Sequence, residues 1–308
     1  MEFTIVLNQV ITLFVILVVG FVAGKFKVMD EMATKRMSEV LLYVTSPLLV
    51  FNSFFIEFTK ERLINIFWML GTASAMFILS IVLSKFIYAR FNENLNPVLR
   101  FTAIFSNCSY MGLPLIKALF GDEGVFFGSF YNVAFYVALW SYGYIMFGGK
   151  GTRKELAKKA LLNPSMISIY AGILVFIFGI SLPDPVRNAV QSVGNMTMPI
   201  SMLIIGGVMS TSKLTTLFTD WRVYLASAIR LIAMPLLALG ILLVVGVPAL
   251  PASVVVTALA MPCAATTTIF SKMFNKDAVF ASKCVTVSTL LSILTAPVII
   301  AFAIGHLM

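Results

Sequence analysis

Long apolar runs recur along the whole chain, separated by short polar or charged stretches. A helix needs about 20 mostly apolar residues to cross the hydrocarbon core of a bilayer. The pattern predicts ten transmembrane helices, over residues 4–24, 36–56, 63–88, 97–120, 124–148, 164–182, 189–211, 221–246, 250–274 and 279–304. Because the runs continue to the end of the chain, they do not represent one signal peptide ahead of a soluble domain.

Composition supports the same class. Of the 308 residues, 60% are hydrophobic and 11% are charged, whereas soluble domains average about 45–50% apolar and about 25% charged residues. A soluble chain this apolar would have too few polar groups to cover its surface. The expected fold class is therefore an all-α membrane protein with the lipid bilayer as its surroundings.

The positive charges fix an expected orientation. When the loops are numbered alternately, one side carries 17 of the 22 lysines and arginines, the other side carries 4, and Arg230 lies inside a span. Since cytoplasmic loops are enriched in lysine and arginine, we expect both termini outside and the central loop in the cytoplasm, in a multi-pass protein of the bacterial inner membrane. The net charge of +9 then reflects topology, and no nucleic-acid partner is expected.

Metal-ligating and nucleophilic side chains are sparse. The three cysteines, Cys108, Cys263 and Cys284, lie in or beside apolar runs, and the single histidine, His306, stands at the C-terminus. This pattern provides neither a disulfide framework nor metal-ligand spacing. We therefore expect no metal site and no enzymatic activity.

Two halves of the chain resemble each other. "FGDEGVFFGS" (120–129) aligns with "FNKDAVFASK" (274–283), and "YVTSPLLVF" (43–51) aligns with "NMTMPISML" (195–203). An odd number of spans per half would place the second half upside down in the membrane. We predict a five-helix repeat over 1–148, a cytoplasmic linker over 149–163, and an inverted second repeat over 164–308. The linker suits either an amphipathic surface helix or a solvated connection.

Two predicted spans carry helix-breaking sequences. The fourth contains "SNCSYMGLP" (106–114) and the ninth contains "MPCAATTT" (261–268). Proline removes a backbone donor and glycine weakens a helix, and irregular backbone at membrane depth is tolerated only inside the protein or along a wet cavity. We expect new helix N-termini near Leu113–Pro114 and Ala264–Thr267, where partial positive charge favours anions. A simple proline kink is the alternative.

The candidate substrate-binding residues follow from these breaks. They are Ser106, Asn107, Cys108, Ser109, Tyr110, Gly112, Pro114, Pro262, Cys263, Thr266 and Thr267, with Pro47, Asn52 and Pro199 from the second and seventh spans. None of the 13 acidic residues lies clearly at mid-membrane, which disfavours a cation pump. Arg230 lies about 12 Å into its span. It would either attract an anionic substrate or cap the carbonyl groups of an unwound helix.

Three stretches resemble the auxin efflux carrier family in its bacterial branch: "SNCSYMGLPLIKALFG", "RLIAMPLL" and "MPCAATTTIFSKMFNKDAVFASKCVTVSTLLSILTAP". The resemblance spans essentially the whole chain. It implies two inverted five-helix repeats, as in bile acid–sodium symporters, with a scaffold of helices 1, 2, 5, 6, 7 and 10 and a transport domain of helices 3, 4, 8 and 9. It also implies that helices 4 and 9 cross, and places Asn107 and the residues around Pro114 and Pro262 at the site.

The resemblance further implies carboxylate substrates, either auxin-like acids or small acids such as malate or malonate. We therefore expect a secondary transporter that moves organic anions by alternating access and needs no resident cofactor. Coupling to Na⁺ or H⁺ stays open, as does facilitated diffusion, and the resemblance implies a homodimer through the scaffold. A channel, a membrane-embedded enzyme and a non-transporting receptor are the alternatives. Inverted halves suit rocking around a central site better than they suit a pore.

Overall fold

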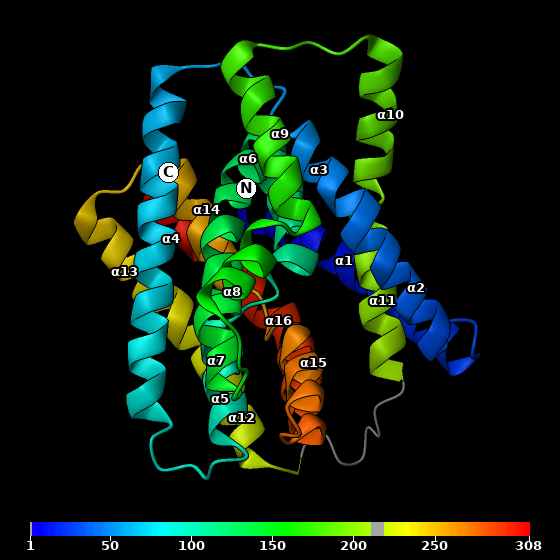
Figure 1. The fold of residues 1–308 in the computed structure, drawn as a ribbon, viewed down its shortest axis with the longest axis vertical. Helices are drawn as coiled ribbons and strands as arrows, with labels where there is room; N and C mark the ends of the chain where they lie inside the picture. Colours follow the sequence, from blue (N-terminus) through cyan, green and yellow to red (C-terminus); the bar gives the residue numbers. More distant parts are fainter. Residues whose placement is uncertain (1, 211–218) are drawn as a thin grey trace.

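The computed structural model describes residues 2–210 and 219–308, and these residues form a bundle of helices (Figure 1). By length and apolar composition, six helical segments could cross a membrane, or seven if a pair bent by 65° counts as one. The six are Val6–Lys25, Lys60–Ile87, Cys108–Met146, Asp184–Ser210, Trp221–Val245 and Ala278–Leu307, and the bent pair is Lys154–Leu161 with Pro164–Phe178. The prediction of an all-helical, multi-pass membrane protein is confirmed.

The helices follow one another along the chain with several π-helical turns, labelled η, between them. The first half contains α1 (Glu2–Lys25), α2 (Glu31–Val40), η1 (Leu41–Thr45), α3 (Ser46–Asn52), α4 (Lys60–Ile87), α5 (Asn96–Ile104), η2 (Cys108–Gly112), α6 (Leu113–Ala138), η3 (Leu139–Gly143) and α7 (Tyr144–Met146). The second contains α8 (Arg153–Leu161), α9 (Pro164–Phe178), α10 (Asp184–Asn195), α11 (Thr197–Ser210), α12 (Trp221–Ala228), η5 (Ile229–Ala233), α13 (Met234–Val245), α14 (Ala249–Leu259), α15 (Thr266–Met273) and α16 (Ala278–Leu307).

The sequence predicts ten spans, but fewer helices in the structure are long enough to cross a membrane, because several of the predicted spans are interrupted. The predicted fourth and ninth spans are each split, so that α5, α14 and α15 are only 9, 11 and 8 residues long. The predicted second span is divided among α2, η1 and α3. The expected loop "FGDEG" is reduced to a single break at Gly121, around which α6 continues.

That break has a counterpart in the second half. Gly121 has a φ of 64°, and Asn275, between α15 and α16, has a φ of 51°. Positive φ is uncommon for residues other than glycine, and asparagine is among those that tolerate it best. The two residues occupy matched positions in the alignment of "FGDEGVFFGS" with "FNKDAVFASK". A residue with positive φ therefore follows each of the two interrupted helices.

Helices α1 and α11 pack along each other more extensively than any other pair of described elements. Their backbones approach closely because glycines stand at the contact. A methyl group added at Gly20 would lie 2.4 Å from the carbonyl oxygen of Leu203, and one added at Gly206 would lie 2.0 Å from that of Leu17. Small residues allow such close approach between membrane helices.

A Gly206→Ala variant is expected to unfold about 2–12 °C below the parent protein, because overpacking of this kind costs about 1–3 kcal/mol and each kcal/mol lowers the melting temperature by about 2–4 °C. Gly240→Ala in α13 is the matched control, since an added methyl group there meets nothing within 4 Å. Thermal unfolding of both variants in detergent tests the prediction. Equal melting temperatures for the two variants would contradict it.

The central linker forms a short helix, α8. It begins with a capping box in which the Thr152 hydroxyl accepts from the Glu155 N–H and the Glu155 carboxylate accepts from the Thr152 N–H. Leu156 is buried on one side, and the Lys159 ammonium lies 4.7 Å from the centre of the Tyr144 ring. The linker is therefore an amphipathic helix packed on the end of the first half, and the solvated-connection alternative does not describe it.

Candidate functional site where two interrupted helices meet

The breaks after α5 and α14 lie against each other inside the bundle. The Asn107 N–H donates to the carbonyl oxygen of Pro262 at 2.8 Å, and the Ala264 N–H donates to that of Phe105 at 3.0 Å. These bonds flank Ser106 and Cys263, which form an isolated antiparallel bridge. The backbone groups that each break exposes are thus satisfied by the other break. The expectation that the two interrupted spans meet is confirmed, and a simple proline kink does not describe either of them.

The helical turns after the first break begin earlier than predicted. They start at Cys108 with the π turn η2, not near Leu113–Pro114. The N–H groups of Met111 and Gly112 both donate to the Asn107 carbonyl at 3.1 Å, so the helix already turns before Pro114. Proline at the start of α6 needs no donor partner, and its fixed φ is compatible with the helix. In the second break, α15 begins at Thr266, within the range expected.

Arg230 connects α5 and α14, the two helices that end at the breaks. Its guanidinium is fully buried and donates to the carbonyl oxygens of Ala103 at 2.9 Å and Ile104 at 3.4 Å through Nη1, and to that of Leu259 through Nη2. These carbonyls end α5 and α14. Since each helix C-terminus carries roughly −0.5 elementary charge, two of them offset the charge of one arginine. This is the carbonyl-capping geometry that the sequence analysis held as one of two alternatives.

A cavity of about 70 Å³ lies beside the crossing. Its wall contains five predicted residues (Ser106, Asn107, Ser109, Tyr110 and Thr266) together with Leu42, Phe135, Tyr136, Leu139, Ala264 and Ala265. The hydroxyl oxygens of Ser106 and Thr266 are buried and have no hydrogen-bond partner among the described residues. The cavity is thus bordered by polar groups that remain available to a ligand, next to the first turns of two helices.

The other predicted residues have different positions. The Thr267 hydroxyl donates to the Ala264 carbonyl at 2.6 Å, and the Cys263 N–H donates to the Ser288 hydroxyl at 3.1 Å, so both support the second break. Cys108, Gly112, Pro114 and Pro262 belong to the crossing without lining the cavity. Pro47, Asn52 and Pro199 do not line it either. Asn52 ends α3 and lies 3.4 Å from a carboxylate oxygen of Asp122.

Two residues of α6 were missed by the sequence analysis. The buried Asn132 accepts from the Ser109 hydroxyl at 3.3 Å and from the Cys108 thiol at 3.4 Å. Tyr136, one turn further along α6, lines the cavity and donates to the Ser165 hydroxyl at 3.3 Å. An asparagine inside the apolar run "VFFGSFYNVAF" was the available signal, because polar side chains within a span usually face the interior.

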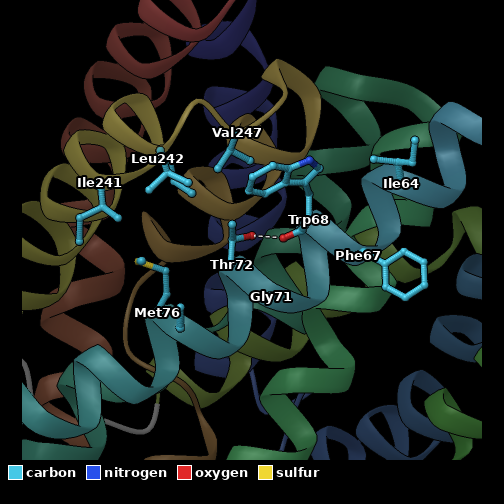
Figure 2. Close-up of a pocket in the computed structure, with 11 residues that line it drawn as sticks. Ile64, Phe67, Trp68, Gly71, Thr72, Met76, Ile241, Leu242 and Val247 are labelled. Carbon is cyan, nitrogen blue, oxygen red and sulfur yellow. Dashed lines mark hydrogen bonds between the residues drawn. The ribbon is translucent and has the colours of Figure 1, made fainter.

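A larger groove of about 510 Å³ runs between α4 and α13, and Figure 2 shows its apolar lining. Thr72 is turned toward its own helix, where its hydroxyl donates to the Trp68 carbonyl at 2.6 Å. Ile64 and Phe67, on the same helix, are 57% and 67% exposed. The groove therefore belongs to the apolar outer face of the bundle and offers no polar recognition to an organic anion.

The described residues contain no group of three or more His, Cys, Asp or Glu side chains that could hold a metal ion. The polar groups at the cavity are hydroxyls, an amide and backbone groups. Such groups recognise carboxylates and other small polar ligands by hydrogen bonding.

The structure therefore belongs to the class of helical membrane proteins with an internal polar site formed where two interrupted helices pair. The chain is a member of the membrane transport protein family, whose model matches residues 5–158 and 152–300, and this confirms the resemblance to auxin efflux carriers. It is 23% identical to an uncharacterized transporter of Methanocaldococcus jannaschii and 24% identical to one of Methanothermobacter thermautotrophicus. Each comparison covers 94% of this chain and 96% of the relative.

The bridge at the crossing predicts a disulfide. Residues opposite each other without mutual backbone bonds in an antiparallel pair have Cα atoms about 4.5 Å apart, within the range of about 4.4–6.8 Å that a disulfide requires. In a variant with Cys108 and Cys284 replaced by alanine, Ser106→Cys is expected to form a disulfide with Cys263 on oxidation.

The measurement uses a protease site inserted in the linker over 149–163. After cleavage, the two halves should stay joined on a non-reducing gel and separate when a reductant is added. Ser129→Cys, placed in buried α6 instead of the bridge, is the control and should leave the halves separable. Separation of the Ser106→Cys halves under oxidising conditions would show that the breaks do not meet as described.

Proposed function

We propose that the protein is a secondary transporter for small organic anions and that the cavity at the crossing is its substrate site. One observation carries this proposal: two helices stop inside the bundle, pair through their backbones and leave unpartnered hydroxyls on the wall of a cavity. The first turns of η2 and α15 border the same cavity. Helix N-termini present N–H groups and partial positive charge, which favour a carboxylate.

The size of the cavity favours small substrates. At about 70 Å³, the cavity favours a small carboxylate over a bulky indole acid. We infer that mono- or dicarboxylates such as malate or malonate are preferred over auxin-like acids. The side chains of Ser106, Asn107 and Thr266 would donate to the carboxylate.

The proposed architecture is two inverted five-helix repeats, similar to that of bile acid–sodium symporters, with α8 as the cytoplasmic linker and both termini outside. The supporting observations are the two interrupted helices, the positive φ at the matched positions Gly121 and Asn275, and the strong charge asymmetry between alternate loops. In this architecture, the third, fourth, eighth and ninth predicted spans (residues 63–88, 97–120, 221–246 and 250–274) would rock against a dimeric scaffold formed by the other six spans. This movement would expose the cavity alternately to the two sides of the membrane.

The experiment is counterflow in proteoliposomes. Vesicles containing the purified protein and unlabelled malonate or malate should accumulate the labelled acid transiently and saturably. Repeating the assay with a sodium gradient, a proton gradient or neither decides between a coupled symporter and facilitated diffusion. A non-saturable flux would indicate a channel, and binding without flux would indicate a receptor. Either result would overturn the proposal.

A further inference from the structure

A second polar cluster lies at the C-terminal end of α4. Lys85 in the last turn of α4, Arg100 in α5 and Tyr142 in η3 lie together where three helical segments converge. The Arg100 Nη2 donates to the Tyr142 hydroxyl. Its guanidinium carbon lies 5.6 Å from the centre of the Tyr142 ring, and the Lys85 ammonium lies 5.8 Å from the same centre.

Two cations thus lie beside one phenol ring. Among the described residues, neither Lys85 nor Arg100 forms an ion pair with a carboxylate. The Arg100 Nε is buried and has no hydrogen-bond partner there. An anion that accepts from both side chains would stabilise two cations beside one ring.

The surroundings indicate where that anion comes from. Phe86, next to Lys85, is 76% exposed, and Ile145, one turn beyond Tyr142, is 56% exposed, so apolar surface adjoins the cations. Basic pockets between transmembrane helices bind the headgroups of anionic lipids, and tyrosine is enriched at membrane interfaces. A soluble anion would gain nothing from the apolar surface, whereas acyl chains attached to a phosphate would cover it.

We propose that Lys85, Arg100 and Tyr142 form a binding site for the phosphate headgroup of an anionic phospholipid, with Phe86 and Ile145 contacting its acyl chains. Under the proposed orientation this site faces the cytoplasmic leaflet, where the surface potential is negative. The site is independent of the substrate cavity, so it stands whether or not the protein carries carboxylates.

The test is native mass spectrometry of the full chain in detergent with equal amounts of phosphatidylglycerol and phosphatidylcholine. The parent protein should retain phosphatidylglycerol preferentially. Each cation near a membrane surface contributes about a five-fold preference for an anionic lipid. In the Lys85→Gln/Arg100→Gln variant, the preference for phosphatidylglycerol over phosphatidylcholine should therefore fall about 25-fold. The Lys60→Gln/Arg187→Gln variant removes the same charge from two exposed cations on the opposite side of the expected topology and should behave like the parent.

Three outcomes would overturn the proposal: equal retention of both lipids by the parent, an unchanged preference in Lys85→Gln/Arg100→Gln, or a loss of the same size in the control. Displacement of the lipid by millimolar sn-glycerol 3-phosphate would instead assign the site to a free phosphate ester. If the double variant does not fold, the exposed Lys85→Gln alone should still lower the preference about five-fold.

Discussion

Replacing Arg230 with alanine is expected to lower the melting temperature by ~10 °C and to reduce the yield of folded protein sharply. The substitution leaves the carbonyl oxygens of Ala103, Ile104 and Leu259 without their shared donor inside the bundle. Each buried polar group left unsatisfied costs about 1–3 kcal/mol, and a chain of this length loses about 2–4 °C per kcal/mol. Thermal unfolding in detergent measures the loss.

Arg222→Ala is the matched control, because Arg222 lies two turns earlier on the same run of helix, where its guanidinium pairs with Asp220 and lies 5.5 Å from the centre of the Phe280 ring. Such pairs contribute about 0–1 kcal/mol. Arg230→Lys should fall between the two, since one ammonium cannot reach both helix ends as the guanidinium fork does. If Arg230→Ala melts within ~2 °C of Arg222→Ala, the arginine does not hold the two half-helices together.

Replacing Asn107 with alanine is expected to reduce transport by about 10- to 150-fold while leaving the melting temperature within ~3 °C of the parent. No described group bonds to the Asn107 side chain, which lies on the cavity wall. Its removal therefore leaves no protein partner unsatisfied. A hydrogen bond to a charged ligand contributes about 1.5–3 kcal/mol, which corresponds to the expected loss.

Initial rates of malonate or malate uptake into proteoliposomes test this prediction alongside the melting temperature. Ser129→Ala is the control, because the Ser129 hydroxyl is buried in α6 and donates to the Phe126 carbonyl of its own helix. It should transport at the parental rate. Normal uptake by Asn107→Ala would show that the substrate site lies elsewhere, whereas a large drop in melting temperature would give Asn107 a structural role.

The positions of the two breaks were predictable because their chemistry is local. Gly112, Pro114 and Pro262 disfavour an uninterrupted helix whatever surrounds them, and polar neighbours in an apolar span indicate an interior position. The start of the second half-helix at Cys108 was not predictable in the same way. A π turn is stabilised by its surroundings, so the position of Pro114 alone placed the helix start five residues too late.

The partners of the site were harder to predict because they depend on contacts between distant parts of the chain. Arg230 was recognised as unusual, but its two interpretations differ only in the direction of the side chain, which packing of η5 against α5 and α16 determines. Asn132 in α6 and Ser288 in α16 form hydrogen bonds with residues of the two breaks. The sequences of these two helices are only weakly amphipathic, so they do not indicate which side of each helix faces the crossing. Asn52 was expected at the site, and it lies beside Asp122 because α3 ends near the reversal at Gly121.

The bridge between Ser106 and Cys263 also constrains the order of assembly during synthesis. Its bonds join residues 105–107 to residues 262–264, which leave the ribosome about 8–31 s apart at typical elongation rates of about 5–20 residues per second. Throughout that interval the first break is in the membrane without its partner, and Arg230 also arrives late. The nascent first half must therefore be sheltered by the insertion machinery or by water until the second half is inserted, and this half is not expected to persist as a separate membrane domain.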